Sequence, residues 1–136
     1  MSTTEKNHST SRILVVDDNS DIRDLITFIL SDAGYQAISA TDGESAWELL
    51  RTSEIDLALL DVMMPGRSGL DLLVDLRGSS ETHLSQLPVL LISAKSQGGD
   101  IERGIALGAN SYLIKPFKAG ALLAEISATL EKVGTQ

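Results

Sequence analysis

Residues 12–18 read Arg-Ile-Leu-Val-Val-Asp-Asp, a short apolar run that ends on two adjacent carboxylates. The run is rich in β-branched side chains and lacks polar alternation, which indicates a strand buried on both faces. A helix is expected over residues 20–33, because the apolar side chains there recur on one helical face. Asn19 or Ser20 can cap the start of this helix, and Gly34 can close its end. The beginning of the chain therefore predicts a strand followed by a helix.

The same alternation recurs along the rest of the chain, where Asp42 and the pair Ser68 and Asp71 stand at helix-capping positions. Strands and helices that alternate with short connections predict an α/β doubly wound fold with right-handed crossovers. We expect a flavodoxin-like, five-stranded parallel sheet of order 2-1-3-4-5 with helices on both faces. Residues 77–87 are expected to form a loop. The further strands are expected at 35–40, 57–60, 89–92 and 111–114, and the further helices at 43–51, 68–76, 99–107 and 119–133.

Composition excludes several classes of protein. The chain has 136 residues, which suits one domain, and its 19 acidic against 11 basic residues give a net charge of −8. This excess of acid argues against direct binding to nucleic acids or to anionic membranes. There is no cysteine, no signal-peptide pattern and no run approaching about 18 apolar residues. We expect a cytoplasmic domain at 12–133, with a flexible tail at 1–11 and a short tail at 134–136.

Three carboxylates stand at the ends of expected strands. Ligands of open parallel sheets bind beyond the carboxyl ends of the strands, where the strand order reverses. Asp17 and Asp18 end the first strand and Asp61 ends its neighbour, so the three should lie within a few ångströms. At an effective dielectric constant of about 20, each pair of charges ~4 Å apart costs about 4 kcal/mol, so the group must take up protons or a cation. Carboxylate oxygens with positions left for water and phosphate describe a Mg²⁺ site.

The other strand ends carry groups suited to phosphoryl chemistry. Ser93 offers a hydroxyl, Ala94 offers an accessible backbone N–H, and Lys115 offers a point charge for Asp61 or for a phosphate. Together with a metal ion, these groups suit transfer of a phosphoryl group to a carboxylate. Each feature alone has a plainer explanation, such as a helix cap, a loop or a solvated serine. These plain explanations do not account well for the occurrence of all these features at one edge of the sheet.

The chain resembles the receiver domains of bacterial two-component response regulators, especially those of the chemotaxis type. The resemblance extends from residue 12 to about residue 132, and its combination of motifs is highly specific. The matching segments are Ile13-Leu-Val-Val-Asp-Asp-Asn19, Leu60-Asp-Val-Met-Met-Pro-Gly66 with Gly69, Ile92-Ser-Ala94, Gly108-Ala109, Tyr112 and Lys115-Pro-Phe117.

This resemblance implies a phosphorylation-dependent signalling switch rather than an enzyme that turns over an external substrate. Asp61 would be the phospho-acceptor. Asp18 would ligate Mg²⁺ directly and Asp17 directly or through water, with Asp61 and the backbone carbonyl of Met63 as further ligands. The phosphodonor would be a phosphohistidine on a sensor histidine kinase or a histidine phosphotransfer protein.

The resemblance also implies the parts of a switch. Lys115 would pair with the phosphoryl group, and its bond to Pro116 is expected to be cis. Ser93 and the backbone of Ala94 would contact the phosphoryl oxygens, and Tyr112 would turn inward behind Ser93. A plain core position for Tyr112 is the alternative.

The expected output surface comprises the helix at 99–107, the strand at 111–114 and the helix at 119–133. It would control an unknown partner or an attached output domain. The first of these helices starts at two glycines and contains Gly104, and glycine costs about 1 kcal/mol in a helix relative to alanine, so this helix is expected to be labile. Trp47 and Phe28 are expected in the core or on a helix face.

Two alternatives belong to other functional classes. A Mg²⁺-dependent phosphohydrolase with an aspartyl nucleophile usually has a second Asp two residues after the nucleophile, but Met63 stands there. A non-phosphorylatable, receiver-like binding module normally lacks the acceptor or the lysine, and both are present.

Two departures from the family pattern lead to predictions. Met63 and Lys95, which flank the site, are poor positioners of hydrolytic water, so phospho-Asp61 should last for minutes or longer. Asn110 and Ser111 replace an acidic pair that helps to build an activated dimer in the winged-helix branch of the family. Activation could still produce a homodimer, but this dimer would not use that acidic network.

Overall fold

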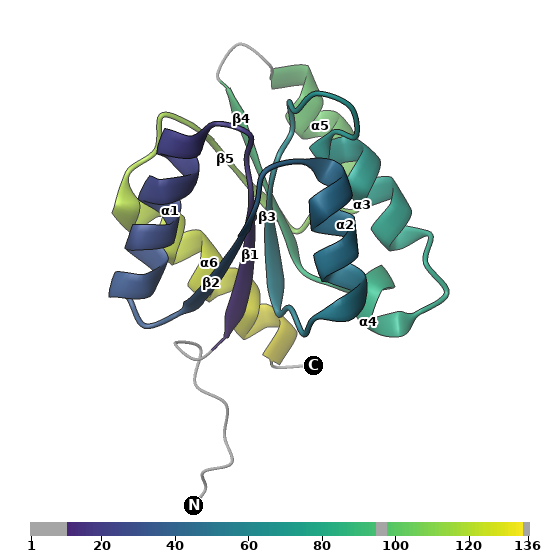
Figure 1. The fold of residues 1–136 in the computed structure, drawn as a ribbon, viewed down its shortest axis with the longest axis horizontal. Helices are drawn as coiled ribbons and strands as arrows, with labels where there is room; N and C mark the ends of the chain where they lie inside the picture. Colours follow the sequence, from purple (N-terminus) through teal and green to yellow (C-terminus); the bar gives the residue numbers. More distant parts are fainter. Residues whose placement is uncertain (1–10, 95–97, 135–136) are drawn as a thin grey trace, which may run out of the picture.

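Five parallel strands form the central sheet, in the order β2-β1-β3-β4-β5. The computed structural model describes residues 11–94 and 98–134, and Figure 1 shows the arrangement of the elements. The predicted flavodoxin-like order is confirmed, with β1 and β3 as neighbours. The strands are β1 (Arg12–Val16), β2 (Gln36–Ala40), β3 (Leu57–Asp61), β4 (Val89–Ala94) and β5 (Ser111–Lys115).

Helices cover both faces of this sheet. One face is covered by α1 and α6, and the other by α2, α3, α4 and α5 (Figure 1). Each face has its own apolar core, because successive strand residues point to opposite faces. None of the helices formed by residues 11–94 and 98–134 is long and apolar enough to cross a bilayer. The helices are α1 (Ser20–Asp32), α2 (Gly43–Thr52), α3 (Gly69–Arg77), α4 (Thr82–Ser85), α5 (Gly98–Ala106) and α6 (Ala119–Gly134).

Polar caps fix the helices that begin at the carboxyl edge of the sheet. Asn19 and Asp42 each accept a hydrogen bond from a backbone N–H of the first turn, at 3.1 Å in α1 and 2.8 Å in α2. Ser68 and Asp71 form a reciprocal capping box at the start of α3. After α1, Gly34 has a φ of 98°, which favours glycine. The predicted caps are therefore confirmed.

One predicted loop contains a helix. The sequence predicts irregular structure over residues 77–87, but the four-residue helix α4 lies within this range. Leu84 and Leu87 are buried and anchor it to the core on the α2 and α3 side of the sheet. A single apolar pair in a polar segment gives too little periodicity to predict a helix.

The two aromatic side chains expected in the core or on a helix face differ in burial. Trp47 is half-buried on α2 and packs against the core. Phe28 is 68% exposed on α1, so it is not a core residue.

The predicted tails lie mostly outside the described residues, since 1–10 and 135–136 are not described. Ser11 is buried, and its carbonyl accepts a hydrogen bond from the backbone N–H of Gln36 at 3.0 Å.

Candidate functional site

Three aspartates meet at the carboxyl ends of β1 and β3. Asp17 is fully buried directly after β1, Asp61 is 5% exposed at the end of β3, and Asp18 is exposed. One carboxylate oxygen of each lies within 4.8 Å of the others. Because β1 and β3 pair in parallel, their carboxyl ends share one edge of the sheet. This edge, with Lys115, is called the acceptor rim below.

Backbone groups hold the two buried carboxylates. The N–H of Asn19 donates to Asp17 Oδ1 at 2.9 Å, and the N–H of Met63 donates to Asp61 Oδ1 at 3.2 Å. A guanidinium nitrogen of Arg23 donates to the backbone carbonyl of Asp17 at 2.8 Å, which ties α1 to the end of β1. The backbone thus orients each carboxylate through Oδ1, and Oδ2 can bind other groups at the rim.

Lys115 provides the positive charge of the acceptor rim. It ends β5, and the peptide bond to Pro116 is cis. Its Nζ donates to Asp17 Oδ2 at 3.0 Å and to Asp61 Oδ2 at 3.3 Å. The ammonium contacts two of the three clustered carboxylates, and negative charge exceeds positive charge at the rim.

This imbalance acts on the pKa of Asp61. Burial, the largest cause, and the negative charge of Asp17 together raise that pKa to about 6, against the opposing effects of Lys115 and the Met63 N–H. Burial acts to lower the pKa of Lys115, but the hydrogen bond to Asp17 and the charges of Asp61 and Asp17 outweigh it, so this pKa is raised. A divalent cation among the carboxylate oxygens would relieve the repulsion. The all-oxygen donor set fits Mg²⁺.

Ser93 and Ala94 lie at the end of β4, next to β3. Ala94 is opposite Lys115 in the β4–β5 register. The hydroxyl of Ser93 is buried and donates to the Ala94 carbonyl at 3.3 Å. Tyr112 on β5 is 44% exposed, so its interpretation as a plain core aromatic is wrong.

Met63 and Lys95 are the two positions that flank the site. Met63 is 55% exposed, and its thioether is only a weak acceptor with no donor, so it is poorly suited to orient a water molecule by hydrogen bonding. Lys95 lies outside the described residues.

Asn110 and Ser111 are bonded within the chain. Asn110 Oδ1 accepts from the backbone N–H of Val89 at 2.9 Å and from Arg77 at 3.2 Å. The Ser111 hydroxyl donates to Glu125 at 2.5 Å. Both side chains therefore stabilise the start of β5 through hydrogen bonds within the chain.

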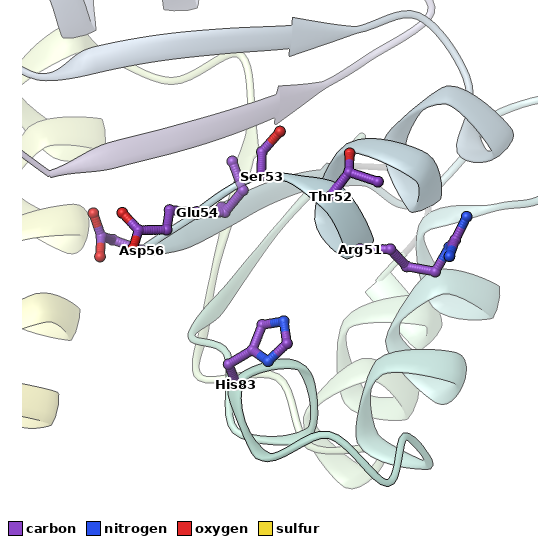
Figure 2. Close-up of a pocket in the computed structure, with 7 residues that line it drawn as sticks. Arg51, Thr52, Ser53, Glu54, Asp56 and His83 are labelled. Atoms are coloured by element: carbon purple, nitrogen blue, oxygen red, sulfur yellow. The ribbon is translucent and has the colours of Figure 1, made fainter.

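A hollow of about 500 Å³ lies at the opposite edge of the sheet. Figure 2 shows its polar lining, to which the end of α2 and the segment before β3 contribute Arg51, Ser53 and Glu54, and α4 contributes His83. An apolar groove of about 330 Å³ instead borders the acceptor rim and is lined by Ile22, Leu25, Lys115, Pro116 and Phe117.

Arg67 lies in the loop of residues 62–68 that follows Asp61, called the acceptor loop below, and it was not predicted to belong to the site. Its guanidinium contacts Glu44, Asp75 and the ring of Trp47, which come from α2 and α3. These residues are far apart in the sequence and share no motif spacing. The only hint in the sequence that Arg67 belongs near the site was its position in the loop that follows Asp61.

A family model and a solved structure both match this chain to receiver domains. The family model described as "Response regulator receiver domain" matches residues 13–127. The receiver domain of NtrX from Brucella abortus has 36% identity and a TM-score of 0.81, over 88% of this chain and 98% of that one.

Two curated relatives are transcriptional regulatory proteins. The chain is 38% identical over 122 residues to the phosphate regulon transcriptional regulatory protein PhoB of Escherichia coli, covering 90% of this chain and 52% of PhoB. It is 42% identical over 115 residues to the transcriptional regulatory protein DltR of Streptococcus agalactiae, covering 85% of this chain and 50% of DltR. The chain thus spans about half the length of these relatives. Their names partly conflict with the prediction that no nucleic acid is bound, which rested on the charge of this chain alone.

Proposed function

The chain belongs to the response regulator receiver domain family, and we propose that its switch operates by Mg²⁺-dependent transfer of a phosphoryl group to Asp61. The observation that supports this assignment most strongly is the pair of hydrogen bonds from Lys115 Nζ to Asp17 and Asp61 at the acceptor rim. A histidine kinase or a phosphotransfer protein is the proposed donor. This chemistry and the absence of cysteine suit a cytoplasmic location.

The proposed transfer exchanges a phosphorus–nitrogen bond for a phosphorus–oxygen bond. An oxygen of the Asp61 carboxylate forms a bond to phosphorus while the phosphorus–nitrogen bond of the donor breaks. The donor imidazole keeps the electron pair of that bond and takes up a proton. Lys115 would pair with the transferred group, and Ser93 and the backbone N–H of Ala94 would donate to its oxygens.

We assign the metal ligands to Asp17, Asp18, Asp61 and the backbone carbonyl of Met63. When bound, Mg²⁺ would neutralise charge on the phosphoryl oxygens. With Ser93 drawn toward the phosphoryl group, Tyr112 would turn inward and change the surface of α5, β5 and α6. This surface would control a partner or an attached output domain.

The apolar groove gives the donor a docking place beside the acceptor. Leu25 lines it and is 50% exposed, and Phe28 lies exposed one turn further along α1. An exposed apolar patch of this kind marks a contact site for another protein.

Phosphoryl uptake tests the proposed function against the phosphohydrolase alternative. With Mg²⁺ and radiolabelled acetyl phosphate, label should accumulate on the protein up to one phosphoryl group per chain, because Asp61 is the single proposed acceptor. Steady hydrolysis of a small phosphoester such as p-nitrophenyl phosphate, without label on the protein, would favour a phosphohydrolase.

Mg²⁺ should stabilise the protein. At a concentration 100 times the dissociation constant, the expected gain is about 2.7 kcal/mol, measured as a rise in Tm. Asp17→Asn should lose most of this rise because it removes a buried ligand. Asp56→Asn removes a carboxylate at the opposite edge of the sheet and should keep the full rise; an equal loss in both variants would contradict the proposed metal site.

The aspartyl phosphate should decay slowly. Because the Met63 thioether is a weak acceptor that orients water poorly, we expect label on Asp61 to persist for minutes or longer after the donor is removed. Met63→Asn adds an amide at this exposed position and should shorten the lifetime. Decay of the wild type within seconds would contradict this prediction.

A further inference from the structure

The loop of residues 62–68 connects the acceptor to α3 and carries Met63, whose carbonyl is a proposed metal ligand. Its ends are close together, since the N–H of Gly69 donates to the carbonyl of Val62 at 3.3 Å. Met64 is buried in the core beneath the loop. The position of the loop therefore depends on a few contacts, and the largest polar set is made by Arg67.

Arg67 binds two helices at once. Its Nε and Nη2 donate to Asp75 Oδ2 of α3 at 3.1 and 2.5 Å. Its Nη1 donates to Glu44 Oε1 of α2 at 3.3 Å. The guanidinium carbon lies 4.8 Å from the centroid of the Trp47 ring, a distance at which a cation is attracted to the ring face. The Arg67 side chain is only 19% exposed, so these contacts are partly shielded from water.

The backbone of Arg67 is held as closely as its side chain. A Cβ atom added at Gly43, the first residue of α2, would lie 2.4 Å from the carbonyl oxygen of Arg67 and 2.5 Å from its Cβ. Glycine at this position therefore lets α2 pack directly on the loop. Because α2 and α3 both contact Arg67, a shift of the loop would break bonds to both helices.

We propose that Arg67 is a positioning residue that holds the acceptor loop and thereby sets the affinity of the rim for Mg²⁺. This inference rests on the proposed function, because it requires the metal to bind at Asp17, Asp18, Asp61 and the loop carbonyl. Arg67 acts on the metal only through the loop. Partners hydrogen-bonded directly to metal ligands typically change metal affinity 10- to 100-fold when they are mutated, and because Arg67 acts through the loop we expect an effect at the lower end of this range.

The test uses the full chain and Mg²⁺, with affinity measured by titration calorimetry. Arg67→Gln should weaken binding about tenfold. Asp75→Ala, which removes the main partner of Arg67 without altering the loop sequence, should weaken it similarly, and the double variant should be no worse than either single one. Arg67→Lys keeps the charge but not the forked geometry, so it should have an intermediate affinity.

Arg77→Gln is the matched control. Arg77 lies at the other end of α3, where it is partly buried and donates to the Gly108 and Ser85 carbonyls. Its loss should lower stability but change Mg²⁺ affinity less than twofold. Trp47 is the only tryptophan, so its fluorescence reports on the Arg67 contact. Mg²⁺ should change this emission in the wild type and in Arg77→Gln, but not in Arg67→Gln.

The outcomes separate the two proposals. If the wild type binds no Mg²⁺, the proposed function and this inference both fail. If the wild type binds Mg²⁺ but Arg67→Gln weakens binding less than threefold, or Arg77→Gln weakens it equally, only the role of Arg67 is overturned.

Discussion

Asp61→Asn is expected to reduce phosphoryl uptake from acetyl phosphate to background. The amide is a poor nucleophile, whereas the ionised carboxylate of Asp61 is held at the rim by the Met63 N–H and by Lys115. The carboxylates of Asp17 and Asp18 remain, but they are assigned to the metal. Label that persists in this variant at the wild-type level would contradict the assignment of Asp61 as acceptor. The variant also serves as the negative control when beryllofluoride-treated protein is used to capture an output partner.

Melting curves distinguish this loss from unfolding. The folded pKa of Asp61 is raised from 3.8 to about 6, so the folded state binds this proton more tightly than the unfolded state. Ionisation of Asp61 therefore costs stability, and this cost develops as the pH rises from about 4 to 6. In Mg²⁺-free buffer, Asp61→Asn should melt close to the wild type at pH 4 and above it at pH 7. A lower Tm for the variant at pH 7 would show that burial and the charge of Asp17 do not outweigh the Lys115 pair.

Gly69→Ala is expected to impair both folding stability and phosphoryl uptake. A Cβ at this position would lie 2.3 Å from the backbone carbonyl oxygen of Asp61, closer than real Cβ contacts. The obstacle is backbone at the end of β3, so the strand end carrying the acceptor must shift. Overpacking of this kind typically costs about 1–3 kcal/mol. Urea unfolding measures the stability, and the labelling assay measures uptake.

Gly120→Ala is the matched control for this substitution. Gly120 lies in the first turn of α6, and an added Cβ would meet nothing within 4 Å. Because alanine is the better helix former, stability should rise by up to about 1 kcal/mol, with uptake unchanged. If Gly69→Ala were as stable as Gly120→Ala, the close approach at Asp61 would not constrain the strand end.

The parallel sheet and the acceptor rim were accessible from sequence because they depend on local patterns. The apolar runs before Asp17 and Asp61 predict buried strands, and the rule that parallel strands share a carboxyl edge brings these residues together. The caps at Asn19, Asp42 and Ser68 were predicted for the same reason, since each involves a helix start a few residues away.

Contacts between segments that are distant in the sequence could not be predicted from local patterns. Nothing in the spacing of Trp47, Arg67 and Asp75 indicates that they form one cluster. Gly104 illustrates the same limit, because its cost in helix propensity led to an expectation of lability in α5. In the structure an added Cβ at Gly104 would lie 2.1 Å from Leu91 Cδ1, so glycine there permits close packing of α5 on β4. Helix propensity and tertiary packing thus give different reasons for the same residue.

The hydrogen bonds of Asn110 and Ser111 affect how this chain could acquire the acidic pair that builds a dimer in the winged-helix branch of the family. An aspartate at position 110 would have Arg77 within the same chain as its ion-pair partner, which would leave less of its charge for a neighbouring copy. An aspartate at position 111 would instead meet Glu125 at close range, a like-charge contact. Acidic residues introduced here would therefore show epistasis with Arg77 and Glu125.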